Sequence, residues 1–231
     1  MPTAFIAGAT GYTGRSVVTS CLAAGLTTVA HVRPDSSSLE TWRQRFEGEG
    51  AVVDTSAWTP EGMTSALQTH EPDLVFSLLG TTQKRGKQDG GSTYESVDFG
   101  LTMMVLNAAC ALEPRPLFVY LSSMGAGGKA PGAYMGVRVR VEAAIEQRGI
   151  EHVIARPSFI TGPDRGENRP GEEIGAVLSD GLLGLVGALG GRKVQQRYRS
   201  ITGPRLAQAL VNLALDPASR GVFEADALQE A

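Results

Sequence analysis

The chain has 231 residues, of which 42% are hydrophobic and 19% charged, and its formal net charge is −3. This composition is that of an ordinary globular protein, and the length suits one domain with a sizeable core. The slight acidic balance argues against a nucleic-acid-binding protein, which usually carries a basic excess. We therefore expect a single domain over residues 1–231.

Short apolar segments alternate with helical patterns along most of the chain. The expected strands are Thr3–Ala7, Thr28–Val32, Ala51–Asp54, Leu74–Leu79, Leu117–Leu121, His152–Ala155 and Gly221–Glu224. The expected helices are Arg15–Ala24, Leu39–Glu47, Pro60–Thr69, Tyr94–Ala111, Tyr134–Arg148 and Pro204–Leu215. Nearly continuous apolar strands separated by helices predict an α/β fold with a doubly wound parallel sheet, the Rossmann arrangement. Residues 157–203 are expected to form most of a small C-terminal lobe on the substrate side.

A glycine-rich segment, Gly8–Arg15, follows the first expected strand directly. Gly8 permits a sharp bend, Gly11 removes the side chain where a pyrophosphate must approach, and Gly14 lets helix and strand pack closely. Backbone N–H groups at the helix start then face the phosphates. The segment therefore predicts a dinucleotide site formed by Gly8, Thr10, Gly11, Tyr12, Thr13, Gly14 and Arg15.

The residues after the second strand bear on which dinucleotide binds. Arg33 follows this strand and suits the 2′-phosphate of NADP through its planar fork, with Ser36–Ser38 and Arg15 nearby. The alternative is NAD, with Arg33 a surface charge and Asp35 on the ribose. We expect NADP rather than NAD. Asp54 is the expected acceptor for the adenine amino group, and the cofactor path continues along Leu79 and Gly80.

A serine, a tyrosine and a cation follow the fifth strand. Ser122 and Ser123 come directly after the strand, Tyr134 stands eleven residues after Ser123, and Arg138 lies one helical turn beyond Tyr134. A tyrosine exchanges protons poorly at neutral pH because its unperturbed pKa is about 10, and a nearby cation favours the phenolate. Ser123 would hold a substrate oxygen while Tyr134 moves its proton. The alternative is that Tyr134 is a surface residue and Ser122-Ser123 merely ends a strand.

Other features exclude further sites and compartments. The two cysteines, Cys21 and Cys110, form no C-x-x-C pattern, and the three histidines have no metal-ligand spacing, so no metal site is expected. The first residues lack the pattern of a signal peptide, and we expect a cytoplasmic protein. The apolar, glycine-rich stretch Ile174–Gly191 is expected to be a buried or pocket-lining helix rather than a membrane segment.

These motifs together resemble the short-chain dehydrogenase/reductase superfamily, in its atypical NAD(P)-binding, epimerase/dehydratase-like branch. The resemblance rests on the glycine segment and on Leu79–Thr82, Leu121–Ser123, Tyr134-x-x-x-Arg138 and Arg156-Pro157. The stretch Arg156–Glu172 is most similar to the Tat-interacting-protein oxidoreductase group. The resemblance implies that Pro157, Ser158 and Phe159 line the nicotinamide pocket, that Tyr134 and Arg138 meet the cofactor, and that residues 81–94 and 162–189 contact substrate.

One position departs from the superfamily pattern, which has lysine where this chain has Arg138. Arginine supplies a positive charge and reaches ribose hydroxyls, but it does not release a proton. The leading hypothesis is an NADP(H)-dependent oxidoreductase acting on a small carbonyl or alcohol. The alternatives are an NADP(H)-binding regulator with a protein partner, and an epimerase or dehydratase that retains its cofactor. Either a monomer or a homodimer fits the sequence.

Overall fold

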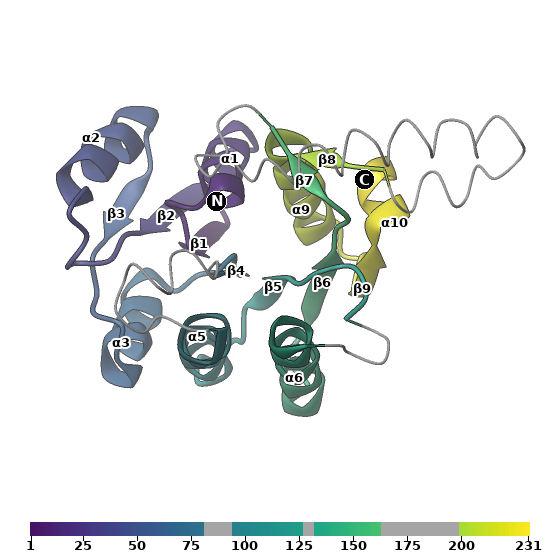
Figure 1. The fold of residues 1–231 in the computed structure, drawn as a ribbon. Helices are drawn as coiled ribbons and strands as arrows, with labels where there is room; N and C mark the ends of the chain where they lie inside the picture. Colours follow the sequence, from purple (N-terminus) through teal and green to yellow (C-terminus); the bar gives the residue numbers. More distant parts are fainter. Residues whose placement is uncertain (81–93, 127–131, 163–198) are drawn as a thin grey trace, which may run out of the picture.

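The structure is a computed structural model and describes residues 1–80, 94–126, 132–162 and 199–231. A seven-stranded sheet has the order β3-β2-β1-β4-β5-β6-β9, with every pair of neighbours parallel (Figure 1). The strands are β1 (Thr3–Ala7), β2 (Thr27–His31), β3 (Val52–Asp54), β4 (Leu74–Ser77), β5 (Leu117–Leu121), β6 (His152–Arg156) and β9 (Gly221–Glu224). The expected doubly wound parallel sheet is confirmed.

Helices cover both faces of this sheet (Figure 1). One face carries α1 (Tyr12–Ala23), α2 (Leu39–Glu49) and α9 (Gly203–Leu215), and the other carries α3 (Pro60–His70), α5 (Thr102–Cys110) and α6 (Ala133–Arg148). Alternation along β1 divides the core, because Ala4 and Ile6 face the first layer whereas Phe5 and Ala7 face the second. All four side chains are fully buried.

The order in which strands are added to the sheet reverses between β1 and β4, which are parallel neighbours in the middle of the sheet. Strands β2 and β3 extend from β1 to one edge, and β5, β6 and β9 extend from β4 to the other. In sheets of this kind ligands bind outside the carboxyl ends of the strands at such a switch point. The segments following β1, β2, β4 and β5 are therefore the ones that build a site.

Three elements differ from the sequence-based expectation. The helix expected from Tyr94 begins as a π-helix, η1 (Tyr94–Leu101), before α5 continues it. A second, two-stranded sheet pairs β7 (Ile160–Thr161) with β8 (Ile201–Thr202). A short helix, α10 (Ala225–Glu230), ends the chain. Two-residue strands paired across forty residues leave no periodic pattern, so the second sheet was not predictable.

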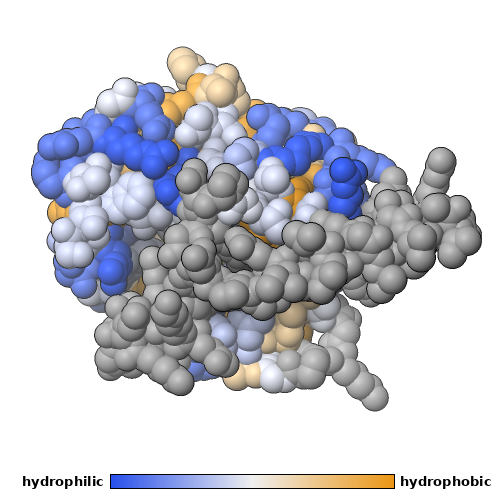
Figure 2. Space-filling view, turned by 45° about the horizontal axis from the view of Figure 1, so that its top comes forward, coloured by the Kyte–Doolittle hydropathy of each residue, from blue (hydrophilic) through white to orange (hydrophobic). Residues whose placement is uncertain are grey.

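The surface shown in Figure 2 is largely hydrophilic over the end of the sheet that carries α2. Among the described residues, no helix has both the length and the apolar character needed to cross a bilayer. The stretch Ile174–Gly191 and most of the expected substrate-side lobe, residues 157–203, lie outside the described residues.

Candidate functional site

The glycine segment has the geometry of an anion cradle. Gly8 has φ +91°, and a Cβ there would lie 2.9 Å from the carbonyl oxygen of Leu78 on the neighbouring chain segment. A Cβ at Gly14 would lie 2.0 Å from the Gly8 carbonyl oxygen, so only glycine lets α1 approach β1 this closely. The Gly11 amide donates to Gly8 O at 3.0 Å and closes the turn.

The start of α1 presents backbone donors. Gly11 is the N-cap of this helix, and no side chain caps it or places an acidic group in its first turn. The first N–H groups of a helix have no carbonyl partner within the helix, and the helix dipole favours an anion beside them. The loop is therefore suited to an anion, and its role toward the pyrophosphate of a dinucleotide stays a prediction.

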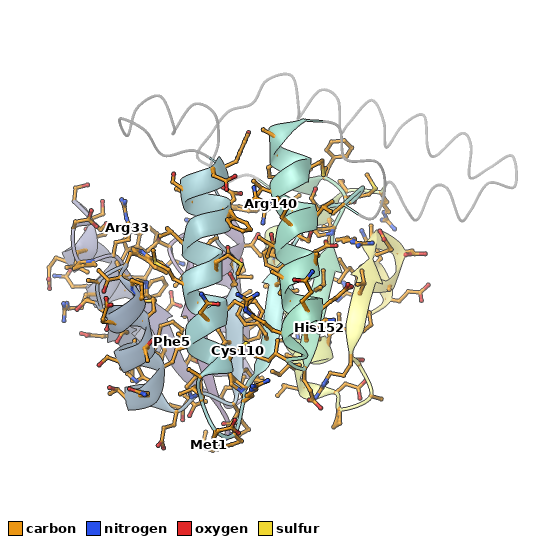
Figure 3. All side chains as sticks on the ribbon, turned by 90° about the horizontal axis from the view of Figure 1, so that it is seen from below. Met1, Phe5, Arg33, Cys110, Arg140 and His152 are labelled. Atoms are coloured by element: carbon orange, nitrogen blue, oxygen red, sulfur yellow. The ribbon has the colours of Figure 1, made fainter. Side chains whose placement is uncertain are left out.

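Arg33 and Arg15 are the two arginines predicted to meet the 2′-phosphate of a bound nucleotide. Arg33 follows β2 with 56% of its side chain exposed, and its Nε is 3.9 Å from Asp35. Figure 3 places Arg33 toward the end of the molecule opposite Met1, where the carboxyl ends of the strands lie. The guanidinium of Arg15 lies 5.8 Å from the ring centre of Tyr12 and 5.9 Å from that of Trp42. Trp42 was not among the predicted site residues.

Asp54 ends β3 with several partners already in place. Its carboxylate accepts from the Ser56 amide at 3.0 Å and the Ser56 hydroxyl at 3.2 Å, and lies 3.1 Å from Nε2 of His70. Buried His31 lies beside it, with Nε2 2.8 Å from the Ser56 carbonyl. Burial lowers the pKa of His31, although the Ser56 bond and Asp54 oppose the shift. The role of Asp54 toward adenine stays a prediction.

Arg138 is buried and held by fixed partners rather than exposed in an open site. Nη2 donates to Oδ1 of Asp98 in a 2.7 Å ion pair, and Nη1 donates to the Tyr120 hydroxyl at 2.9 Å and to the Leu121 carbonyl at 3.0 Å. Burial raises the pKa of Tyr120 to about 12 although Arg138 opposes it, so this phenol is neutral at pH 7. Nη2 of Arg138 also reaches the Leu79 carbonyl at 3.5 Å.

The guanidinium of Arg138 also lies over the ring of Tyr134, 5.0 Å from its centre. The structure therefore brings two of the three predicted catalytic residues together, although the contact is with the ring face. Tyr134 is half-buried, and its ring lies 5.2 Å from that of Tyr94 on η1. Asp98, also on η1, is the functional neighbour that sequence reasoning missed, because a carboxylate forty residues upstream carried no motif.

The two serines after β5 have different surroundings. Ser122 is buried and its hydroxyl donates to the carboxylate of Glu142 on α6. Arg156 binds the same carboxylate through Nε at 3.1 Å and Nη2 at 2.6 Å. Ser123 is half-buried, so its side chain is more accessible to a substrate than that of buried Ser122. This agrees with the choice of Ser123 as the residue that would orient the substrate oxygen. The Glu142–Arg156 pair ties α6 to the ends of β5 and β6.

The remaining predicted cofactor residues surround the carboxyl ends of β4 and β6. Leu79 is buried and Gly80 is exposed, and a Cβ at Gly80 would lie 3.3 Å from Nη2 of Arg138. The carbonyl of Pro157 accepts from the Met124 amide at 3.0 Å. The Ser158 hydroxyl donates to the Arg199 carbonyl, and Phe159 is 44% exposed. Residues 81–93 and 163–189, expected to contact substrate, lie outside the described residues.

Curated relatives of this chain are fungal proteins. Protein FMP52, mitochondrial, from Candida albicans is 28% identical over 185 residues, which cover 78% of this chain and 76% of the relative. Protein fmp52, mitochondrial, from Emericella nidulans is 31% identical over 186 residues, which cover 78% and 75%. Because these relatives are named mitochondrial, the expectation of a cytoplasmic protein is wrong. The narrower resemblance to the Tat-interacting-protein group stays a prediction.

Solved structures share the fold. The enzyme WbmH of Bordetella bronchiseptica, in complex with NAD⁺, superposes with a TM-score of 0.68 at 15% identity, covering 96% of this chain and 74% of that one. AtPrR2 with NADP⁺ and (+)pinoresinol gives a TM-score of 0.66 at 17% identity over 96% and 69%. A short-chain dehydrogenase/reductase from Burkholderia thailandensis gives 0.64 at 19% identity over 94% and 87%.

The family comparison agrees with the geometry of the glycine loop. The model of a family described as NAD(P)H-binding matches residues 8–179, which begin at the first glycine of the cradle. The match begins directly after β1 and includes the ends of β2, β4 and β5, near which most of the predicted site residues lie. Because it extends over more than half of the residues, the chain belongs to this NAD(P)H-binding family.

Proposed function

We propose that this protein is an NADP(H)-dependent oxidoreductase that acts on a small carbonyl or alcohol. The observation that carries the proposal is the close approach of Tyr134 and Arg138 near the carboxyl ends of β4 and β5, in an NAD(P)H-binding fold. A bound nicotinamide supplies or accepts the hydride. The protein's own residues then have to orient the substrate oxygen and move its proton.

Tyr134 is the residue to which we assign proton transfer, and Ser123 the one that orients the oxygen. The positive charge of Arg138 favours negative charge developing on the Tyr134 oxygen. Asp98 offsets part of this field, because its carboxylate lies 2.7 Å from Nη2 of Arg138. Arg138 does not release a proton, so it is assigned the electrostatic role alone.

The cofactor assignment to NADP rests on Arg33 and Arg15. Arg33 has an exposed guanidinium after β2, beside the serine-rich segment Ser36–Ser38. A planar guanidinium binds a phosphate through two parallel hydrogen bonds, which a 2′-hydroxyl does not match. Arg15 lies on the first turn of α1, and its guanidinium lies near the ring of Trp42. Trp42 is on α2, the helix that follows Arg33 and Ser36–Ser38 in the chain.

The test is NADPH oxidation by the purified protein across a panel of small aldehydes and ketones. Tyr134→Phe should lower kcat/KM by about 10²-fold or more while NADPH binding, followed by its fluorescence, is retained. Ser123→Ala should also lower kcat/KM with little change in NADPH affinity. Tight NADPH binding by the wild type with no oxidation of any panel member contradicts the proposal.

A second candidate is an NADP(H)-binding regulator that signals to a protein partner. The observation in its favour is Arg138, whose guanidinium is held by Asp98, Tyr120 and Leu121 and so resembles a structural cation. In cells, Gly11→Asp should then abolish the phenotype by blocking the pyrophosphate, whereas Tyr134→Phe should leave it intact. Equal loss with both variants argues for the enzyme.

A further inference from the structure

The side chain of Tyr12 extends from the nucleotide loop to the second sheet. Tyr12 is the first residue of α1, and its hydroxyl donates to the carbonyl oxygen of Thr161 at 3.0 Å. Thr161 is the last residue of β7, 149 positions along the chain. One hydrogen bond therefore joins the helix that receives the pyrophosphate to the strand that follows Pro157–Phe159.

Two glycines form a slot for the Tyr12 ring. A Cβ at Gly162, which follows β7, would lie 1.7 Å from the Tyr12 hydroxyl oxygen. A Cβ at Gly203, which follows β8, would lie 2.6 Å from Cε1 of the same ring. Each strand of the second sheet is thus followed directly by a glycine, and the two glycines lie against different parts of one phenol. Tyr12 therefore contacts the last residue of β7 through its hydroxyl, and its ring lies beside the glycine that follows β8.

The backbone of Tyr12 lies where a bound nucleotide acts. An amide at the first position of a helix has no carbonyl partner within the helix and faces an anion at the N-terminus. The guanidinium of Arg15, one turn later, lies 5.8 Å from the centre of the Tyr12 ring. A phosphate bound at the glycine loop would therefore act on Tyr12 in two ways: through the Tyr12 backbone amide and through the Arg15 guanidinium beside the Tyr12 ring.

We propose that Tyr12 is a positioning residue that couples nucleotide binding at the glycine loop to the placement of the β7–β8 sheet. A nucleotide that favours the ordered start of α1 also favours the Tyr12–Thr161 bond, and the same free energy acts in both directions. Pro157–Phe159, the residues expected to line the nicotinamide pocket, lead directly into β7. The coupling would therefore also affect the position of these residues. The inference rests on the nucleotide site of the proposed function and does not require hydride transfer.

The alternative is that the Tyr12 ring only fills space between α1 and the second sheet. Tyr12→Phe separates the two, because it keeps the ring in its slot and removes only the bond to Thr161. If the Tyr12 ring only fills space, Tyr12→Phe should leave the effect of nucleotide on the second sheet unchanged. A coupling residue loses the response of the second sheet to nucleotide while the cradle itself still binds.

The experiment measures amide hydrogen exchange with and without saturating NADPH or NADP⁺. The reporter is the Ile201 amide, which donates to the Phe159 carbonyl at 2.9 Å and lies in the second sheet. We expect nucleotide to slow exchange of the wild-type peptide over residues 199–203 by about fivefold or more. Tyr12→Phe should abolish most of this slowing while the nucleotide Kd changes by no more than about tenfold.

Gly203→Ala provides a second variant, because its methyl displaces the ring while the hydroxyl remains. Gly48→Ala is the matched control, since a Cβ at that helical position meets nothing within 4 Å. Gly203→Ala should lose the nucleotide-dependent slowing and Gly48→Ala should keep it. The inference is overturned if Tyr12→Phe keeps the full response, or if the wild type binds nucleotide with no change at Ile201.

Turnover measured on the same samples separates this inference from the proposed function. Intact coupling without any carbonyl reduction contradicts the oxidoreductase and leaves Tyr12 as a coupling residue. Normal wild-type turnover without a response at Ile201 contradicts the coupling alone.

Discussion

Arg138 shows how one residue type changes the meaning of a motif. The sequence places a cation one turn after Tyr134, and the structure confirms that the guanidinium and the ring meet. The same guanidinium is buried, pairs with Asp98 and binds carbonyl oxygens at the ends of β4 and β5. These contacts join segments at the switch point, in addition to the electrostatic role that we propose for Arg138.

Removing Arg138 should destabilise the fold strongly. Arg138→Met removes the guanidinium that pairs with the buried Asp98 carboxylate, which should cost about 3–5 kcal/mol in the free energy of unfolding, measured with urea. Asp98→Asn in the same chain should recover part of that loss. Arg140→Met is the matched control, because its pair with Glu95 is exposed and its loss should change stability little. Equal effects of the two single variants would contradict a buried structural pair.

Arg33 should discriminate between the two dinucleotides. Arg33→Ala removes charge-assisted hydrogen bonds worth about 1.5–3 kcal/mol, so the NADPH Kd should rise by about tenfold to a hundredfold. The NADH Kd should change little, because NADH has no 2′-phosphate. Fluorescence titration of both nucleotides measures this, with Arg220→Ala as an exposed arginine remote from β2. An equal rise for NADPH and NADH would contradict the assignment of NADP.

At the scale of elements, glycine has opposite effects at two helical positions. Gly48→Ala, at an exposed position of α2, should raise the free energy of unfolding by about 0.5–1 kcal/mol, because alanine loses less backbone entropy on folding. Gly14→Ala places a methyl 2.0 Å from the Gly8 carbonyl oxygen, so α1 must move and nucleotide binding should be lost. Urea unfolding and NADPH titration of both variants test this pair. Unchanged NADPH binding by Gly14→Ala would contradict the close-approach argument.

The elements also show what local pattern predicts and what it misses. Strands β1, β5 and β9 match the predicted bounds, because each has a short apolar segment flanked by residues typical of turns or loops. The π-helical start of the Tyr94 helix was not predicted, since an apolar repeat does not distinguish hydrogen-bonding registers. The β7–β8 pairing was missed because two residues per strand show no period.

At the scale of the whole molecule, buried His31 should make stability depend on pH. Burial lowers the pKa of His31 in the folded state, so the unfolded chain binds more protons near neutrality. The associated stability is fully present above the unfolded pKa of about 6.5 and is lost as the pH falls from there through the lower folded pKa. Urea unfolding between about pH 8 and 5 measures this. His31→Gln should show a shallower decline, and an equally steep one would contradict the assignment.

The doubly wound sheet and the glycine turn after β1 were both predictable from the amino-acid sequence. Both depend on local chemistry: apolar strands alternate with helices, and Gly8, Gly11 and Gly14 allow a turn and an approach that no side chain permits. The partners of the candidate catalytic residues, in contrast, depend on how the chain folds in three dimensions. Asp98 pairs with Arg138, forty residues away in the chain, and Tyr12 contacts Thr161, 149 residues away. Crossover connections between parallel strands bring these distant segments together near the carboxyl ends of the strands. Such contacts leave no mark on neighbouring positions in the chain, so spacing and periodicity do not reveal them.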